Sequence, residues 1–198
     1  MSTETVRSVM QAESAELEKL AESIDSRAIK RFEGMIRDED RCIFFTGCGT
    51  SAMAARKCVH TLQVIGRRAF YLNPSDAVHG GLGAIRDEDV VIVISKGGET
   101  KELSAFIPCL REKGATIVVV GEKEESSIGK MASLFIRVKI DREPDSFNML
   151  ATASTLAVIS LFDGIAISLM RESGFSREAF LANHPSGDVG ARLAEGRE

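Results

Sequence analysis

Two segments of the chain place small and hydroxyl-bearing residues directly after an apolar run. Residues 47–52 read Gly-Cys-Gly-Thr-Ser-Ala, and residues 95–100 read Ser-Lys-Gly-Gly-Glu-Thr. Glycines after a buried strand let the backbone turn sharply and approach a ligand closely. A helix that follows such a turn offers free N–H groups and a positive dipole end, which favour an anion, and hydroxyl groups add hydrogen bonds. Two such turns predict a binding site for a phosphorylated small molecule.

The two turns supply the candidate phosphate-binding residues. These are Gly47, Gly49, Thr50, Ser51, Ser95, Lys96, Gly97 and Thr100. A Gly/Ser turn after a strand is common in α/β proteins, so either turn alone is a weak signal. The prediction therefore depends on the two turns together and on the other motifs of the chain.

Two of the three histidines also stand in small-residue loops, where a side chain can reach a ligand. His79 opens His-Gly-Gly-Leu-Gly at 79–83, and His184 opens His-Pro-Ser-Gly-Asp-Val-Gly at 184–190. From the residues alone, structural histidines that cap helices are the preferred interpretation of both loops. The third histidine, His60, falls within an expected helix and receives no functional role.

Five apolar runs, mostly separated by helix-length segments, define the elements that position these residues. The runs lie around 42–46, 69–72, 90–94, 116–120 and 134–138. This alternation predicts right-handed βαβ units and an α/β fold with a five-stranded parallel sheet covered by helices on both faces. Helices are expected at 51–64, 100–113, 126–131, 152–172 and 176–182, after two N-terminal helices. Ligands of such sheets bind beyond the carboxyl ends of the strands, where both turns fall.

Length, composition and net charge limit the classes of protein to which the chain can belong. The 198 residues, 44% hydrophobic and 27% charged, are typical of a globular protein and predict a single domain over 1–198. The net charge of −4 carries no basic surplus, so neither a nucleic acid nor an anionic membrane is an expected partner. The longest apolar segment, Thr155 to Met170, is interrupted at Asp163 and is shorter than the roughly 20 residues that span a bilayer. A buried helix and a cytoplasmic location are predicted.

The cysteines do not form a recognisable metal or redox motif. Cys42, Cys48, Cys58 and Cys109 have neither CxxC spacing nor a neighbouring histidine pattern, so we expect reduced, buried thiols. A reactive role for Cys48, which lies in the first turn, is disfavoured. No resident metal is expected, although imidazoles and carboxylates meeting in one pocket could capture adventitious zinc, which would inhibit rather than assist.

Taken in order, five motifs resemble those of the sugar isomerase (SIS) domain, and within it the arabinose-5-phosphate isomerases. The resemblance runs from Val9 to Leu193 and rests on residues 47–52, 79–83 and 95–100, on Glu143 nine residues before Thr152, and on residues 184–193. It implies a flavodoxin-like SIS fold with extra N-terminal helices. The implied activity is that of an intramolecular oxidoreductase, which interconverts an aldose phosphate and a ketose phosphate by an enediol-type proton transfer. Arabinose 5-phosphate and ribulose 5-phosphate are the candidate pair, and no cofactor is implied.

The same resemblance implies four catalytic positions: His79, Glu99, Glu143 and His184. Either glutamate could be the carbon base. His184 is favoured for ring opening, because imidazole titrates near physiological pH, and His79 for holding a hydroxyl or polarising the carbonyl. Structural alternatives stay open at this point, since Glu99 could complement a helix start and Glu143 could be a surface charge.

Departures from the family pattern concern the phosphate site. Thr50 stands where the family has a lysine, Lys96 where it has an asparagine, and Gly97 where it has a serine. Because lysine is a flexible point charge, we hypothesise that Lys96 supplies the charge missing at position 50. Pro-Asp-Ser follows Glu143 where the family often has Ala-Cys-Pro, which bears on substrate identity.

The alternative function is a non-catalytic sugar-phosphate sensor. Regulators with SIS domains usually carry an N-terminal helix-turn-helix, whereas the first forty residues here predict only two helices. Many arabinose-5-phosphate isomerases continue into paired CBS domains, and this chain stops at Glu198. The apolar faces of the N-terminal and long C-terminal helices predict a homodimer or homotetramer, in which His184 completes a neighbour's pocket.

Overall fold

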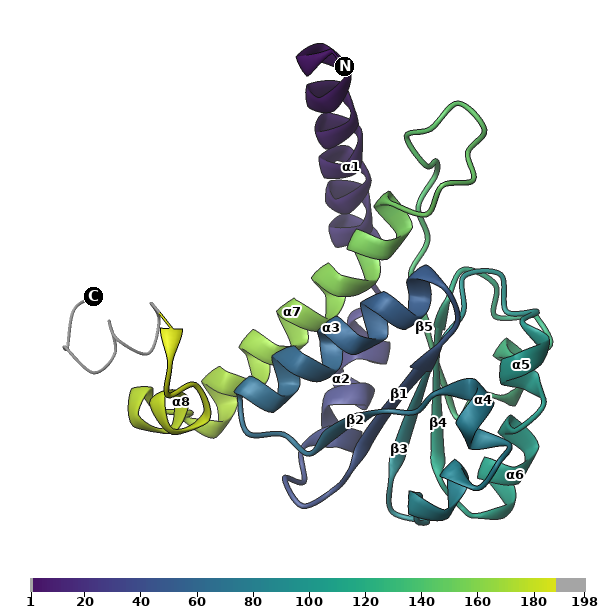
Figure 1. The fold of residues 1–198 in the computed structure, drawn as a ribbon, viewed down its shortest axis with the longest axis vertical. Helices are drawn as coiled ribbons and strands as arrows, with labels where there is room; N and C mark the ends of the chain where they lie inside the picture. Colours follow the sequence, from purple (N-terminus) through teal and green to yellow (C-terminus); the bar gives the residue numbers. More distant parts are fainter. Residues whose placement is uncertain (1, 188–198) are drawn as a thin grey trace.

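A five-stranded parallel sheet forms the centre of the molecule. The computed structural model describes residues 2–187 (Figure 1). The strands are β1 (Ile43–Gly47), β2 (Ala69–Tyr71), β3 (Val90–Ile94), β4 (Thr116–Gly121) and β5 (Leu134–Arg137). Their order is β2-β1-β3-β4-β5, and every neighbouring pair is parallel. The predicted sheet is confirmed, and each strand begins and ends within about one residue of its expected bounds.

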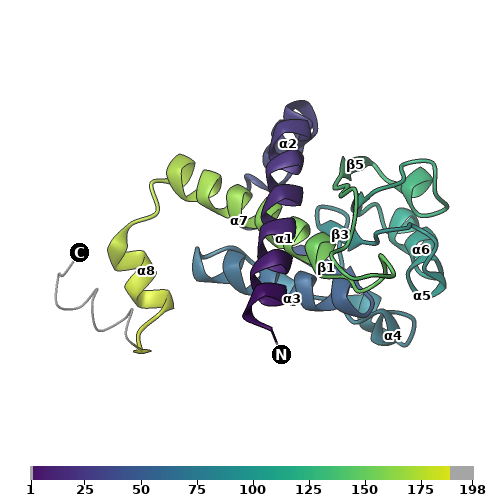
Figure 2. The same ribbon diagram turned by 90° about the horizontal axis from the view of Figure 1, so that it is seen from above.

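Helices cover both faces of the sheet (Figures 1 and 2). One face is covered by α2 (Ser26–Ile36), α3 (Thr50–Val64) and α7 (Ala153–Ser173), and α1 (Thr3–Ser23) packs against α7. The other is covered by α4 (Pro74–Ala77), α5 (Lys101–Ser104) and α6 (Ile107–Glu112), with short 3₁₀ turns at Gly81–Ala84 and Gly129–Met131. All residues of β1 and β3 are buried, as expected for strands enclosed on both sides.

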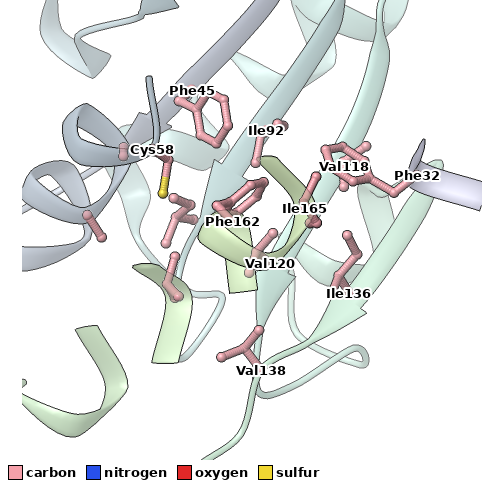
Figure 3. Packing of buried hydrophobic residues seen from close by; sticks show 14 of the residues in the cluster. Phe32, Phe45, Cys58, Ile92, Val118, Val120, Ile136, Val138, Phe162 and Ile165 are labelled. Atoms are coloured by element: carbon pink, nitrogen blue, oxygen red, sulfur yellow. The ribbon is translucent and has the colours of Figure 1, made fainter. Parts of the chain in front are cut away.

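Phe162 of α7 anchors the larger of the two cores. Its ring centroid lies 4.9 Å from that of Phe45 and 5.9 Å from that of Phe32, both in edge-to-face geometry. Figure 3 shows these rings against Ile92 and Val118 of the sheet. Edge-to-face pairs of this kind add about 0.5–1.5 kcal/mol beyond the area that they bury. This packing fixes α7, and therefore its N-terminus, relative to β1 and β3.

Helix α7 confirms the long helix expected at 152–172. It continues through Asp163, whose carboxylate pairs with Lys57 of α3, and ends before Gly174, which is in a left-handed conformation. It has 21 residues, and an 18-residue window within it has a mean hydropathy of 1.8, so by length and composition it could cross a membrane; it is the one such helix in the described part of the chain. Core helices share these properties, and Phe162 and Ile165 of α7 are buried in the core.

Two predicted helices differ in the structure. The helix expected at 100–113 is divided into α5 and α6, because Pro108 lacks an N–H group and its ring would clash with the carbonyl of Ser104, where α5 ends. The helix expected at 126–131 is reduced to the 3₁₀ turn at Gly129–Met131. A Cβ atom on Gly129 would lie 2.2 Å from the Glu124 carbonyl oxygen, so the chain folds back tightly here.

Apolar side chains are exposed at one end of the molecule. The N-terminal part of α1 extends beyond the sheet, and the loop of residues 141–152, between β5 and α7, rises from the same end (Figure 1). Within this loop, Phe147 is 79% exposed and Met149 is 81% exposed. The Asp145 carboxylate nevertheless accepts the backbone N–H groups of Phe147, Met149 and Leu150 at 2.9–3.0 Å. The loop therefore has an ordered backbone beneath uncovered apolar side chains.

Candidate functional site

The candidate site lies where the order of the strands changes direction. From β1 the chain passes outward to the edge strand β2, and from β3 it passes the other way to β4. The turns at 47–50 and 95–100 follow β1 and β3, which are neighbours, so both stand at this switch point. The sheet thus brings the two turns to one edge, as the sequence predicts.

A small cavity opens at this edge. Its volume is about 60 Å³, and its polar wall consists of Thr50, Ser51, Lys96, Ser154 and Thr155. Sites for whole small molecules usually measure 300–1,000 Å³. Only a small group, such as a phosphoryl group, fits inside, and the rest of a ligand must lie outside the cavity.

The first turn presents the start of α3 to the cavity. Gly49 precedes the helix with φ +57° and ψ −129°, and no side chain among the described residues caps the first N–H groups of this 15-residue helix. Ser51 is half-buried and Thr50 is exposed. A Cβ atom on Gly47 would lie 3.0 Å from the Ser51 carbonyl carbon, which explains the glycine at that position. Uncapped N–H groups and hydroxyls at a helix start form an anion-binding arrangement.

The second turn uses its hydroxyl groups internally. Ser95 Oγ accepts a hydrogen bond from the Gly98 N–H group at 3.2 Å and lies 3.2 Å from Thr100 Oγ1. The following helix, α5, has only four residues. Of the residues predicted from this turn, Lys96 lines the cavity, whereas Ser95, Gly97 and Thr100 are not part of its wall.

Glu143 is fully buried and joins Lys96 to the start of α7. Its Oε1 atom accepts hydrogen bonds from Lys96 Nζ at 2.8 Å and from the Ser154 hydroxyl. Its Oε2 atom accepts the N–H groups of Thr152 at 3.1 Å and Ser154 at 3.3 Å. Burial acts to raise the pKa of Glu143, but the hydrogen bonds from Lys96 and from the start of α7 outweigh it and lower the pKa.

Glu99 turns away from this cavity. Its exposed carboxylate accepts hydrogen bonds from the N–H group of Ser127 at 3.0 Å and from its hydroxyl at 2.6 Å. These bonds lower the pKa of Glu99. The carboxylate holds the loop after β4, in a separate surface groove that Glu122 and Lys123 also line. The structure does not bring Glu99 together with Lys96 and Glu143.

The two candidate histidines also lie outside the cavity wall. His79 is exposed and follows α4, which comes after β2 in the chain and packs near α5. His184 follows α8 (Arg177–Asn183), which packs at the far end of α3, where Asn183 Nδ2 donates to the Val64 carbonyl oxygen at 3.0 Å. Since α3 rises about 1.5 Å per residue, His184 is roughly 20 Å from the first turn of its own chain. Residues 188–193 of its motif lie outside the described residues.

Sequence reasoning missed Ser154 and Thr155 as parts of the cavity wall. The available signal was the hydroxyl-rich sequence Thr-Ala-Ser-Thr at 152–155, at a predicted helix start. It also missed Gly121, where a Cβ atom would lie 2.3 Å from the Ser95 carbonyl oxygen. No pattern along the chain could have indicated this contact, because it joins the ends of two different strands.

The cysteines are all free thiols, but the expectation of burial holds only in part. Cys58 is buried, and this raises its pKa to about 12. Burial and the charge of Glu102 raise the pKa of Cys48, so this thiol is not activated. Cys109 is exposed on α6, contrary to the prediction. Within residues 2–187, no three His, Cys, Asp or Glu side chains are grouped to hold a metal ion.

This doubly wound sheet, with a small cavity at its switch point, has the architecture of α/β proteins that bind ligands beyond the carboxyl ends of their strands. The SIS domain matches residues 35–167, and the chain belongs to the SIS domain family. It is 32% identical over 187 residues to the arabinose 5-phosphate isomerase GutQ of Salmonella typhi, which covers 94% of this chain. The chain spans 58% of the length of that relative.

Solved structures share the fold over nearly the whole chain. A proposed sugar-phosphate isomerase from Listeria monocytogenes is 41% identical, with a TM-score of 0.90 over 94% of this chain and 100% of the other. A protein of E. coli CFT073 in complex with arabinose 5-phosphate is 26% identical, with a TM-score of 0.88 over 93% of this chain and 100% of the other. The fold class and the family resemblance inferred from the motifs are confirmed.

Proposed function

We propose that this protein is a sugar-phosphate aldose–ketose isomerase, an intramolecular oxidoreductase acting on arabinose 5-phosphate and ribulose 5-phosphate. The observation that carries the proposal is the cavity at the start of α3, whose hydroxyl groups and lysine suit a phosphoryl group. The names of the relatives and the arabinose 5-phosphate complex of a structural neighbour support the sugar-phosphate class.

In the proposed reaction, the cavity holds the phosphate while the reacting carbons lie outside it. A base removes a proton from the carbon next to the carbonyl, and an enediol-type intermediate receives the proton at the adjacent carbon, so no redox cofactor is needed. Binding the phosphate in one place holds the reacting carbons in a defined position relative to the base. Lys96 is proposed to offset phosphate charge, and His79, Glu99, Glu143 and His184 stay predictions for the acid–base and positioning roles.

The distance to His184 makes a second copy of the chain part of the proposal. His184 is roughly 20 Å from the cavity of its own chain, by the length of α3. A homodimer or homotetramer would let His184 serve a neighbour and would cover the exposed Val6 and Met10 of α1. A cytoplasmic location belongs to the same proposal.

Mixing two impaired variants tests the shared site. His184→Ala and Lys96→Gln chains are unfolded together, refolded as mixed oligomers and assayed at a substrate concentration near the wild-type KM, where each variant alone is weakly active. If sites are shared, a mixed pair of chains contains one site with both native residues, so activity returns. A mixture no more active than its two components would contradict a shared site, and refolded wild-type protein is the control for recovery.

Incubating the purified protein with a panel of sugar phosphates in deuterated water tests the activity itself. An isomerase incorporates deuterium at the carbon next to the carbonyl and accumulates the isomeric sugar. Sugar-phosphate binding without deuterium incorporation would instead favour the sensor. Absence of both binding and incorporation would overturn the sugar-phosphate proposal.

A further inference from the structure

The ion pair between Glu143 and Lys96 joins a buried carboxylate to a cation in the cavity wall. We infer that Glu143 is a positioning residue, which fixes the Lys96 ammonium group for a substrate phosphate, and that it does not accept the proton moved in the isomerisation. The inference rests on the proposed function, because it assigns roles within the same site.

The Glu143 carboxylate is buried and fully hydrogen-bonded. Both carboxylate oxygens are occupied by donors from Lys96, Thr152 and Ser154, and the side chain is 0% exposed. A general base must come within about 2.6–3.2 Å of the group whose proton it takes, or reach it through one water. For Glu143 this would require leaving the first N–H groups of α7, which would then lose their cap.

The loop before α7 holds Glu143 from the backbone side as well. Its N–H group donates to Asn148 Oδ1 at 2.7 Å, and Asn148 adopts a positive φ of 57°. Asparagine tolerates this left-handed conformation better than most residues. Glu143 is thus constrained through both its main chain and its side chain. Its carboxylate is therefore held in place and can hold the Lys96 ammonium group in one position.

Lys96 has the opposite character, since its side chain is 42% exposed. Its ammonium group has three donors, and one is used by Glu143 Oε1 at 2.8 Å. Glu122 Oε1 lies 3.9 Å away, beyond hydrogen-bond distance. The cation can therefore bond to Glu143 and to a phosphate in the cavity at once. Because a free lysine loses considerable rotamer freedom when it is fixed, holding it in advance favours phosphate binding.

A double-mutant cycle separates this role from that of a base. For a positioning residue, Glu143→Gln and Lys96→Gln each raise KM about ten- to hundredfold, the range expected for a lost charge-assisted contact, and change kcat much less. The double variant then resembles Lys96→Gln alone, because Glu143 acts through Lys96. If Glu143 were the base, Glu143→Gln would lower kcat by about 10²–10⁴ in both backgrounds, which would overturn the inference.

Lys57→Gln is the matched control. It removes a different lysine–carboxylate pair, the one between Lys57 and Asp163 of α7, and Lys57 lies outside the cavity wall. Its KM and its inhibition by inorganic phosphate should equal those of the wild type. In Lys96→Gln the inhibition constant of phosphate should rise about tenfold. An unchanged constant in Lys96→Gln would overturn the inference.

A second readout covers the case in which Glu143→Gln fails to fold. In Lys96→Gln a glutamate base would lose its cationic partner, and the acid limb of the kcat–pH profile would move to higher pH. For a positioning residue this limb stays in place while KM rises. Failure of the proposed function looks different, because the wild-type protein would then show no deuterium incorporation with any sugar phosphate.

Discussion

The turns after β1 and β3 carry similar residues, yet their hydroxyl groups serve different purposes. The first turn opens a 15-residue helix and directs Thr50 and Ser51 to the cavity. The second opens a four-residue helix, and Ser95 and Thr100 bond within the turn itself. A repeated motif therefore identifies one edge of the sheet, but it does not show that the first turn lines the cavity with hydroxyl groups and the second with Lys96.

The glycines of the two turns give the largest predicted contrast. Gly98 has φ +71°, and a Cβ atom there would lie 1.9 Å from Ser126 Oγ, whereas Gly49 has φ +57° and open space around it. Gly98→Ala should cost about 3–5 kcal/mol, because overpacking adds to backbone strain, and Gly49→Ala about 1–2 kcal/mol from strain alone. Urea unfolding measures both free energies, and equal costs would contradict the contrast.

Substituting the serines of the two turns should give smaller effects than substituting the glycines. Ser95→Ala should lower the free energy of unfolding by about 1–2 kcal/mol, because the Gly98 N–H group loses its acceptor. Ser51→Ala should leave stability within about 0.5 kcal/mol and raise KM for the sugar phosphate several-fold. Urea unfolding and steady-state kinetics on both variants test this. The reverse assignment of effects would show that the hydroxyl group of Ser95, and not that of Ser51, binds the phosphate.

Glu99, in the second turn, and Glu143, in the loop before α7, differ in their expected response to acid. Both have a lowered pKa when folded, so each contributes stability above the usual glutamate value of about 4.3 that is lost as the pH falls through the lower folded pKa. Glu143 is buried and Glu99 is exposed, so Glu143→Gln should flatten the fall of Tm between about pH 5 and 3 more than Glu99→Gln. A steeper profile for Glu143→Gln would contradict the assigned environment.

The sequence predicts the sheet well, because enclosed parallel strands need unbroken apolar runs and the intervening helices follow from their spacing. It also predicts which edge carries the site, since both turns follow such runs. It does not reveal where side chains point. Glu99 reaches Ser127 and Glu143 reaches Lys96 across more than 25 residues each, and these partners depend on how loops of different strands meet. His184 shows the same limit, because its motif does not reveal that α8 packs at the distant end of α3.

The backbone of the loop before α7 is already tied to Asp145, although Phe147, Met149 and Leu150 project into solvent. A partner that binds these side chains meets a loop whose backbone is already ordered, so binding requires little further loss of backbone conformational entropy. Without such a partner, the exposed apolar side chains favour self-association at high protein concentration. Salts that strengthen apolar contacts should increase this self-association.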